Sequence, residues 1–520
     1  MVKNILLTIL FIIFCAGILT LSLRGISGNP TDEVLNQHYW KDEGPLELSP
    51  DRGKFALTFS VVEDKSFIFS LPVARFATPD LGYVNGQYVS LFAPGVSFIT
   101  IPGYILGKSF GAAQVGTFAI IALFALLNVI LLRAIAIRLG ATPLAATIAS
   151  LLFIFATPAF TYAVTLYQHH ISTFLILLSI YTLLRWNNIW SLFLIWFLCA
   201  ASIPIDYPNL FLMFPIGLYA LGRLVIFNKE ENKLNISIKL VGFVTFIAAA
   251  LPLSFFLWFN QISYGNPLQL SGTVPSVKAI DAQGNPTTPD VIGTENVEKF
   301  INPEQQEKSA VRFFKTRNLL AGLDTHFTSP DRGILVYTPI VLFGVLDMFL
   351  LYKRNQQILS LLLGIIGANI LLYSMWGDPY GGWAFGSRYL IPSYAILSIF
   401  LALALTNLRK SSLFLLIFFI TLSYSVAVNT LGAITSSRNP PKVEAISLEK
   451  LSGVAEKYTY ERNFDFLKSN RSKSFIFQSF ANKYLLAWHY YLLITFSIIT
   501  LSAFLLLYLR LSVKENNVRI

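Results

Sequence analysis

Long apolar stretches, separated by polar connectors, run through most of this chain. Roughly 20 apolar residues cross about 30 Å of hydrocarbon as a helix, and many of these stretches have about that length. We therefore predict an all-α polytopic membrane protein with about 12 transmembrane helices. We place them at residues 4–23, 112–132, 142–160, 168–184, 189–204, 207–225, 238–259, 334–352, 357–375, 388–407, 411–430 and 486–509.

Basic residues gather in the short connectors that follow the even-numbered stretches, as at Arg133, Arg138, Arg409 and Lys410. Short loops rich in Lys and Arg remain in the cytoplasm, so both termini are expected inside, in what is expected to be a bacterial plasma membrane. The long polar segments then all lie outside. The sequence predicts a single membrane domain over 1–520 with three large extracytoplasmic loops, at 24–111, 260–333 and 431–485.

Composition and charge agree with this assignment. The chain is 54% hydrophobic and only 13% charged, which is typical of a membrane protein. The net charge of +11 reflects basic residues in the short connectors, where they set the topology and attract anionic lipid headgroups. No basic stretch has the interleaved aromatic residues of a nucleic-acid-binding surface. We therefore expect membrane lipids and no nucleic acid as partners. Cys15 and Cys199 both lie in apolar stretches, so no disulfide framework is expected in the outer loops.

The first outer loop contains a predicted helix. Ser49 is a candidate N-cap with Pro50 at the first helical position, and Phe55, Phe59 and Val62 follow at helical spacing. A helix with one apolar face is expected to lie along the membrane surface. The apolar segment 91–106 is interrupted by prolines and glycines, so we expect it to be re-entrant or interfacial.

The first candidate for chemistry is Asp51, with Lys54 one helical turn later. A carboxylate at a membrane surface can act as a general base toward an attacking hydroxyl. The alternative is structural, because an acidic residue in a first helical turn is favoured by the helix dipole alone.

The second candidate is the connector 376–389, which is dense in glycine and aromatic residues. Trp383 and Tyr389 could stack on sugar rings, and Arg388, at headgroup depth, could hold a lipid phosphate. An interfacial aromatic belt with a snorkelling arginine is the structural alternative.

Two further candidates lie at the outer ends of apolar stretches: His169 with His170, and Asp206. Adjacent histidines point to different helix faces, so a shared metal site is not expected. One histidine could bind a phosphate or a sugar hydroxyl, or both could be structural, and Asp206 could be a turn residue or line a polar cavity. No phosphate-binding loop, HExxH or CxxC pair occurs, and no cofactor is predicted. No metal is predicted either, because arginine and histidine could supply the charge that a leaving phosphate needs.

Four segments together resemble the GT-C membrane glycosyltransferases, the group that includes protein O-mannosyltransferases and aminoarabinose transferases. The segments are Ser49–Phe67, Tyr83–Tyr104, Ser329–Pro339 and Trp376–Pro392. The resemblance implies an outward-facing cavity and a sugar donor linked to polyprenyl phosphate. It places the family's catalytic carboxylate at Asp51, followed by the basic-aromatic pair Lys54 and Phe55.

The sequence departs from the family pattern at two places. Leu91 and Phe92 stand before Ala93, where many relatives have a lysine for the donor phosphate, so that role is either vacant or taken by Arg388. Asp32 and Glu33 resemble the acidic pair of other branches and are the fallback for the catalytic carboxylate.

These features predict a hexosyltransferase that moves a sugar from a polyprenyl-phosphate donor to an extracytoplasmic acceptor, which could be protein, lipid or polysaccharide. Asp51 is the expected base. The substrate-binding residues are expected to be Lys54, His169, His170, Asp206, Trp383, Arg388 and Tyr389. A flippase for lipid-linked oligosaccharides, or another transporter, is the alternative, although transporters usually carry ionisable groups near the midplane. A non-catalytic scaffold for envelope assembly is a second alternative.

Overall fold

A computed structural model describes residues 2–41, 43–230, 233–287, 313–348, 351 and 355–518. The helices that correspond to the predicted apolar stretches form a bundle. They are α1 (Val2–Ser22), α7 (Ala113–Arg138), α8 (Pro143–Phe155), α9 (Ala159–Ala163), α10 (His169–Arg185), α11 (Ile189–Ala201), α12 (Asn209–Gly222), η2 (Leu240–Ala249), α13 (Ala250–Tyr264), α16 (Ile334–Tyr337), η7 (Pro339–Asp347), α18 (Gln356–Ser374), α19 (Ile391–Leu408), α20 (Ser412–Ile434) and α24 (Ala487–Val518).

Each predicted stretch is at least partly helical in the structure, and the all-α polytopic membrane fold is confirmed. Among the described residues, six helical segments are long and apolar enough to cross a membrane: Ala113–Arg138, Gly242–Tyr264, Gln356–Ser374, Arg388–Leu408, Ser412–Ile434 and Ala487–Ser512. The stretch 142–160 is broken, because Pro158 caps a second short helix, α9. The stretch 334–352 is α16 followed by the 3-10 helix η7, and residues 349–350 and 352 lie outside the described part.

The segments between these helices carry a second set of shorter elements. The helices are α2 (Asp32–Leu35), α3 (His38–Lys41), α4 (Ser49–Phe59), α5 (Leu71–Ala77), α6 (Gly95–Ser109), α15 (Leu319–Phe327), α21 (Lys442–Ser452), α22 (Glu461–Lys468) and α23 (Phe475–Ser479). The π-helical turn η1 (Ser60–Asp64) extends α4. Short 3-10 turns are η3 (Ser271–Thr273), η6 (Thr316–Asn318), η8 (Arg388–Leu390) and η9 (Ala481–Lys483).

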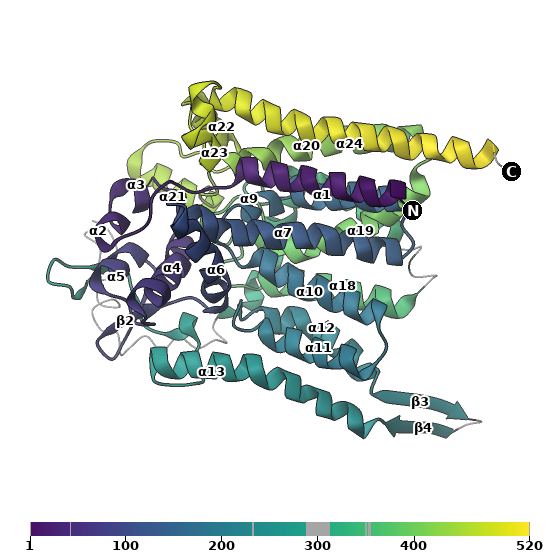
Figure 1. Ribbon diagram of the computed structural model, residues 1–520, viewed down its shortest axis with the longest axis horizontal. Helices are drawn as coiled ribbons and strands as arrows, with labels where there is room; N and C mark the ends of the chain where they lie inside the picture. The colour runs from purple at the N-terminus through teal and green to yellow at the C-terminus, as the bar shows by residue number, and fades with distance from the viewer. Residues whose placement is uncertain are drawn as a thin grey trace.

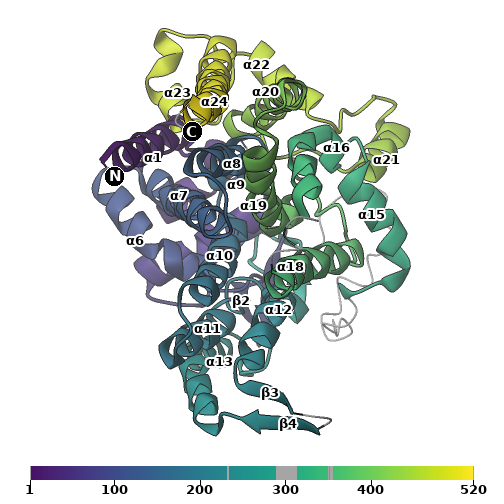
Figure 2. The ribbon, with the colours of Figure 1, turned by 90° about the vertical axis from the view of Figure 1, so that its right-hand side faces the viewer.

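The two ends of the bundle differ. Figure 1 shows both termini and the hairpin of β3 (Val225–Glu230) and β4 (Lys233–Ile238) at one end. Helices α2 to α5 and α21 to α23 lie at the opposite end. Figure 2, turned by 90°, shows α24 and α20 on one side of the bundle and α11, α13 and the β3–β4 hairpin on the other. The segments 24–111 and 431–485 therefore build one layer at the end away from the termini.

Strand pairing joins the first two long segments. Strand β1 (Leu81–Val84) pairs antiparallel with β2 (Gln87–Ser90), with Leu81 opposite Ser90. Its other edge pairs with β5 (Ser276–Val277), with Leu81 opposite Val277. A separate small hairpin forms from β6 (Ala279–Ile280) and β7 (Pro286–Thr287). Residues 288–312 of the predicted second loop lie outside the described part of the chain.

Helix α4 differs from the expectation of a helix on the membrane surface. Its residues from Asp51 to Phe59 are all buried, and Phe55 packs against the rings of Trp40, Phe76 and Tyr104. The N-cap position is Leu48 and not Ser49, whose hydroxyl donates instead to Asp80. The helix is thus enclosed by protein on every side, and its polar residues face other parts of the chain.

The segment 91–106 forms most of α6, a helix that contains Pro102. It packs very closely on α7, since a Cβ atom on Gly103 would lie 2.3 Å from the carbonyl oxygen of Gly116. Thr58 of α4 donates to the carbonyl of Ser97 at 3.0 Å. Helix α6 therefore fixes α4 against the bundle.

Candidate active site

Asp51 is a buried carboxylate without a hydrogen-bond partner. It lies in the first turn of α4 and has 0% exposure, and neither carboxylate oxygen accepts a hydrogen bond from the described part of the chain. Burial raises the pKa of Asp51 to about 7, although Lys54, Arg24 and Arg388 act in the opposite direction. A carboxyl group with such a pKa can take up a proton near neutral pH.

Two cations from distant parts of the chain lie against one aromatic ring. The Lys54 Nζ atom is 4.6 Å from the centre of the Tyr167 ring, and the Arg388 Cζ atom is 4.7 Å from the same centre. Burial lowers the pKa of Lys54 to about 8, while Asp51 raises it. Both groups influence the pKa of Asp51, so the three charges form one electrostatic cluster.

The Arg388 guanidinium has N–H groups that are not used in hydrogen bonds within the described part of the chain. It begins the 3-10 turn η8, which leads into the membrane-spanning helix α19. Its Nη2 atom donates to the carbonyl of Gly381 at 2.7 Å. Its Nε and Nη1 atoms are buried and have no hydrogen-bond partner among the described residues. Gly381 has φ +70°, a backbone conformation that favours glycine, so the glycines of the connector shape the turn that holds this arginine. Buried free guanidinium donors suit an anionic group.

Aromatic rings connect Arg388 to His169. The His169 ring is stacked on Tyr167 at 5.7 Å and meets the edge of Tyr389 at 6.3 Å. Tyr389 in turn stacks on Tyr373 at 4.1 Å. The His169 Nε2 atom is buried and has no hydrogen-bond partner. His169 and Tyr389 therefore lie beside the two cations, as expected for one site.

Asp206 belongs to the same region, whereas His170 faces away from it. The Gln168 amide donates to Asp206 at 3.2 Å, and burial raises the pKa of Asp206 to about 6. Asp206 also raises the pKa of Lys54. His170 instead lies 2.8 Å from the carbonyl oxygen of Ala159 and also contacts Asn128. The two adjacent histidines thus point in different directions.

The structure places the remaining candidates elsewhere. Trp383 donates from Nε1 to Glu444 at 2.8 Å, and Arg438 and Arg462 lie against its ring. Asp32 and Glu33 are exposed in the first turn of α2, in contrast to the buried Asp51.

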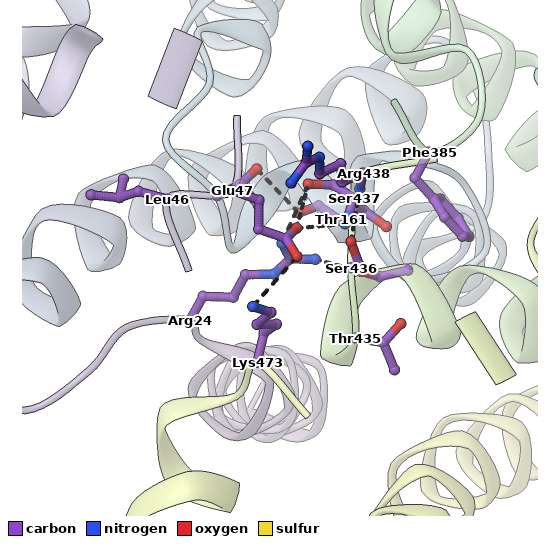
Figure 3. A network of polar contacts seen from close by, with 12 residues as sticks. Arg24, Leu46, Glu47, Thr161, Phe385, Thr435, Ser436, Ser437, Arg438 and Lys473 are labelled. Carbon is purple, nitrogen blue, oxygen red and sulfur yellow. Dashed lines mark hydrogen bonds and ion pairs between the residues drawn. The ribbon is translucent and has the colours of Figure 1, made fainter. Parts of the chain in front are cut away.

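A buried ion network beside Asp51 was not predicted (Figure 3). Arg24 is fully buried, and its Nη1 atom lies 3.0 Å from Glu47 Oε2. Glu47 also accepts from the Ser437 backbone N–H at 2.9 Å, and Lys473 lies 3.7 Å from its other oxygen. Lys473 and Arg24 keep the pKa of Glu47 below its usual value even though burial raises it. This network ties the segment 24–111 to the segment 431–485.

Comparisons with known proteins give weak matches. No protein-family model matches this chain, and no curated protein matches it significantly. Among solved structures, the chain is similar to ArnT from Cupriavidus metallidurans in the apo state, at 14% identity over 97% of this chain and 75% of ArnT, with a TM-score of 0.46. It is similar to the same ArnT bound to undecaprenyl phosphate, at 14% identity over 95% and 77%, with a TM-score of 0.48.

A third match is the archaeal oligosaccharyltransferase AglB from Archaeoglobus fulgidus, in complex with an inhibitory peptide and a dolichol-phosphate. The identity is 14%, over 94% of this chain and 56% of AglB, and the TM-score is 0.39. At these TM-scores we infer function from the residues of the site itself.

Proposed function

We propose that this integral membrane protein is a glycosyltransferase that moves a sugar from a polyprenyl-phosphate donor to a hydroxyl group of an acceptor. One observation carries the proposal: the buried Asp51 has no hydrogen-bond partner and lies in one electrostatic cluster with Lys54 and Arg388, which share the Tyr167 ring. An unpartnered base next to two cations suits a reaction in which a hydroxyl attacks and a phosphate leaves.

Arg388 and Lys54 would hold the donor phosphate. Arg388 stands where a membrane-spanning helix begins, which is the depth at which a lipid phosphate lies. Its free Nε and Nη1 groups can each donate a hydrogen bond to an anionic oxygen. The rings of Tyr167, His169 and Tyr389 lie next to this position and hold the two cations in place.

Asp51 would act as the general base. It takes the proton from the acceptor hydroxyl while the hydroxyl oxygen bonds to the anomeric carbon of the sugar. The bond from that carbon to the phosphate oxygen breaks, and the polyprenyl phosphate leaves with the electron pair. Lys54 and Arg388 stabilise the charge that develops on the phosphate, in a buried environment where such contacts are strong.

The orientation of the protein follows from the same proposal. Basic connectors are expected at the end of the bundle that carries the termini. Helix α4, which contains Asp51, lies in the layer at the other end (Figure 1). Lys and Arg in short loops favour the cytoplasmic side, so the site would face out of the cytoplasm.

A mass profile of envelope glycans, glycolipids and glycoproteins tests this function. It compares a deletion strain with the same strain that carries the wild-type protein. We expect one sugar substituent to disappear in the deletion strain and to return on complementation. If instead the lipid-linked sugar accumulates on the cytoplasmic side and every acceptor loses its sugar together, the protein is a transporter. If no glycan changes, the transferase proposal is wrong.

A further inference from the structure

A polar cavity opens in the layer that contains the segment 431–485. Its volume is about 520 Å³, which lies within the usual range for small-molecule sites. Two phenylalanines and several amide and hydroxyl side chains line it, together with four basic and two acidic residues. The basic residues are Arg438, Arg462, Arg471 and Lys473, and the acidic ones are Glu43 and Glu47.

Some of the charged side chains in this cavity are paired with opposite charges within the protein, and others are not. Glu47 is already engaged by Arg24, Lys473 and the Ser437 backbone. Arg462 is paired with Glu456. In the described part of the chain, neither Arg438 nor Arg471 forms an ion pair with a carboxylate. Glu43 is the one lining carboxylate outside these pairs, so the two guanidinium groups leave an excess of positive charge that an anion from outside the protein can compensate.

Aromatic contacts hold both of these arginines in position. The Arg438 guanidinium lies 5.1 Å from the centre of the Trp383 ring, and that of Arg471 lies 4.9 Å from the Phe466 ring. A guanidinium that stacks on a ring keeps its N–H groups in the ring plane available for a bidentate contact. Phe466 and Phe477 add apolar faces, and Asn470, Gln478 and Asn482 add amide groups that suit sugar hydroxyls.

The cavity lies next to the candidate active site. Glu47 forms part of its wall, and Asp51 follows four residues later in the same segment. Arg24 and Glu47 both act on the pKa of Asp51, and Arg52 donates to the Glu47 carbonyl at 3.4 Å. Figure 3 shows Arg438 and Lys473 around Glu47. The wall of this cavity that contains Glu47 is therefore electrostatically linked to the proposed base.

We propose that this cavity binds an anionic saccharide, meaning a sugar that carries a phosphate or carboxylate group, as part of the acceptor. Arg438 and Arg471 bind the anionic group, and the phenylalanines and amides bind the sugar ring. The assignment to the acceptor rests on the proposed glycosyltransferase function, whereas the binding of an anionic saccharide does not.

Calorimetric titration of the full-length protein in detergent tests the binding. The probes are glucose 1-phosphate, glucuronate and neutral glucose. We expect the two anions to bind and glucose to bind at least about tenfold more weakly, because each charge-assisted contact contributes strongly. The relative strength of the two anions distinguishes a phosphate from a carboxylate site. Raising the salt concentration should weaken the binding of both.

Matched variants locate the site. Arg438→Gln/Arg471→Gln should weaken binding of the anions at least about tenfold. Arg471→Gln alone should also weaken it, and because Arg471 is exposed this variant keeps the test valid if the double variant folds poorly. Lys450→Gln, an exposed charge change on α21, should bind as the wild type does. Equal binding of glucose and the anions, or unchanged binding in the arginine variants, would overturn the proposal.

Failure of this binding proposal can be distinguished from failure of the proposed glycosyltransferase function. Asp51→Asn should bind glucose 1-phosphate normally even if it transfers no sugar. In a transfer assay with the wild type, glucose 1-phosphate should raise the apparent KM for the acceptor and leave that for the donor unchanged. Competition with the donor would contradict the assignment to the acceptor.

Discussion

Asp51 and Asp331 hold the same position in two copies of the pentapeptide Ser-Pro-Asp-Arg-Gly, but only the Asp331 carboxylate is hydrogen-bonded. Asp331 accepts from the Lys442 backbone N–H at 2.9 Å and from the Ser329 hydroxyl. Both oxygens of Asp51 are buried without a partner. The arginines that follow have similar roles, since Arg52 donates to the Thr78 carbonyl and Arg332 to the Gly382 carbonyl. The pentapeptide thus anchors loops in both places, and in one copy its carboxylate remains unbonded.

We expect the difference in hydrogen bonding between Asp51 and Asp331 to appear in the thermal stability of their asparagine variants. The pKa of Asp51 is about 7 in the folded protein and 3.8 as its ordinary value, so between these values the folded state binds more protons. Its contribution therefore becomes less favourable as pH rises through this window. Asp51→Asn removes that penalty, so its thermal midpoint should exceed that of the wild type by a margin that grows from pH 5 to pH 8.

Asp331→Asn is the control for this stability measurement. The substitution removes a charged acceptor from a buried carboxylate that is hydrogen-bonded, so we expect a loss of about 1–3 kcal/mol in the free energy of unfolding. A constant difference between Asp51→Asn and the wild type at every pH would contradict the raised pKa of Asp51.

The rate of sugar transfer should follow a bell-shaped pH profile. The base acts only when Asp51 is deprotonated, so the rate should rise through about pH 7. Lys54 stabilises the phosphate only when protonated, so the rate should fall above about pH 8. A series of initial rates from pH 5 to pH 9 checks both limbs. If the residual activity of Asp51→Asn retains the acidic limb, another group is responsible for it.

Arg388 should contribute to catalysis through its free donors. We expect Arg388→Gln to lower kcat/KM for the donor about 100-fold or more, the usual effect of losing a well-placed electrostatic contact. Arg388→Lys should keep part of the rate, because it retains the charge but not the bidentate geometry. Arg409→Gln, just after the other end of α19, is the control and should behave as the wild type does. Equal rates for Arg388→Gln and Arg409→Gln would remove Arg388 from the site.

The orientation can be measured with single cysteines in a Cys15→Ser/Cys199→Ser background. Lys450→Cys in α21 should react with a membrane-impermeant maleimide in intact cells. Lys410→Cys, in the connector between α19 and α20, should react only after the membrane is opened. The reverse pattern would place the site on the cytoplasmic side.

The apolar pattern predicts the bundle well because the membrane requires uninterrupted helices. The stretches at 112–132 and 411–430 correspond to α7 and α20 with small changes in their ends. Breaks within a stretch, such as the one at Pro158, depend on packing between helices and are not visible in hydrophobicity alone. The enclosure of α4 also depends on other segments, so its apolar residues were assigned to a membrane surface.

The site could be predicted only in part. Asp51, Lys54 and Arg388 stand out because of their residue types and their places in the chain, and their roles remain predictions. The shared Tyr167 ring could not be inferred, since it unites three segments that are far apart in sequence. The role of Glu47 could not be predicted, because a single acidic residue in a polar loop does not indicate a buried ion pair. Its partner Arg24, directly after an apolar stretch, gives only a weak indication of one. The contacts of the Trp383 ring with Arg438 and Arg462 could not be predicted either, and its stacking on a sugar stays a prediction.

The most direct test of the account is the envelope glycan mass profile of a deletion strain complemented with wild type, Asp51→Asn or Asp331→Asn at equal protein levels. General-base catalysis typically contributes about 100-fold to 10,000-fold, so we expect the missing sugar to return with wild type and with Asp331→Asn, and to stay near the level of the deletion strain with Asp51→Asn. Full restoration by Asp51→Asn would contradict the assignment of Asp51 as the catalytic base.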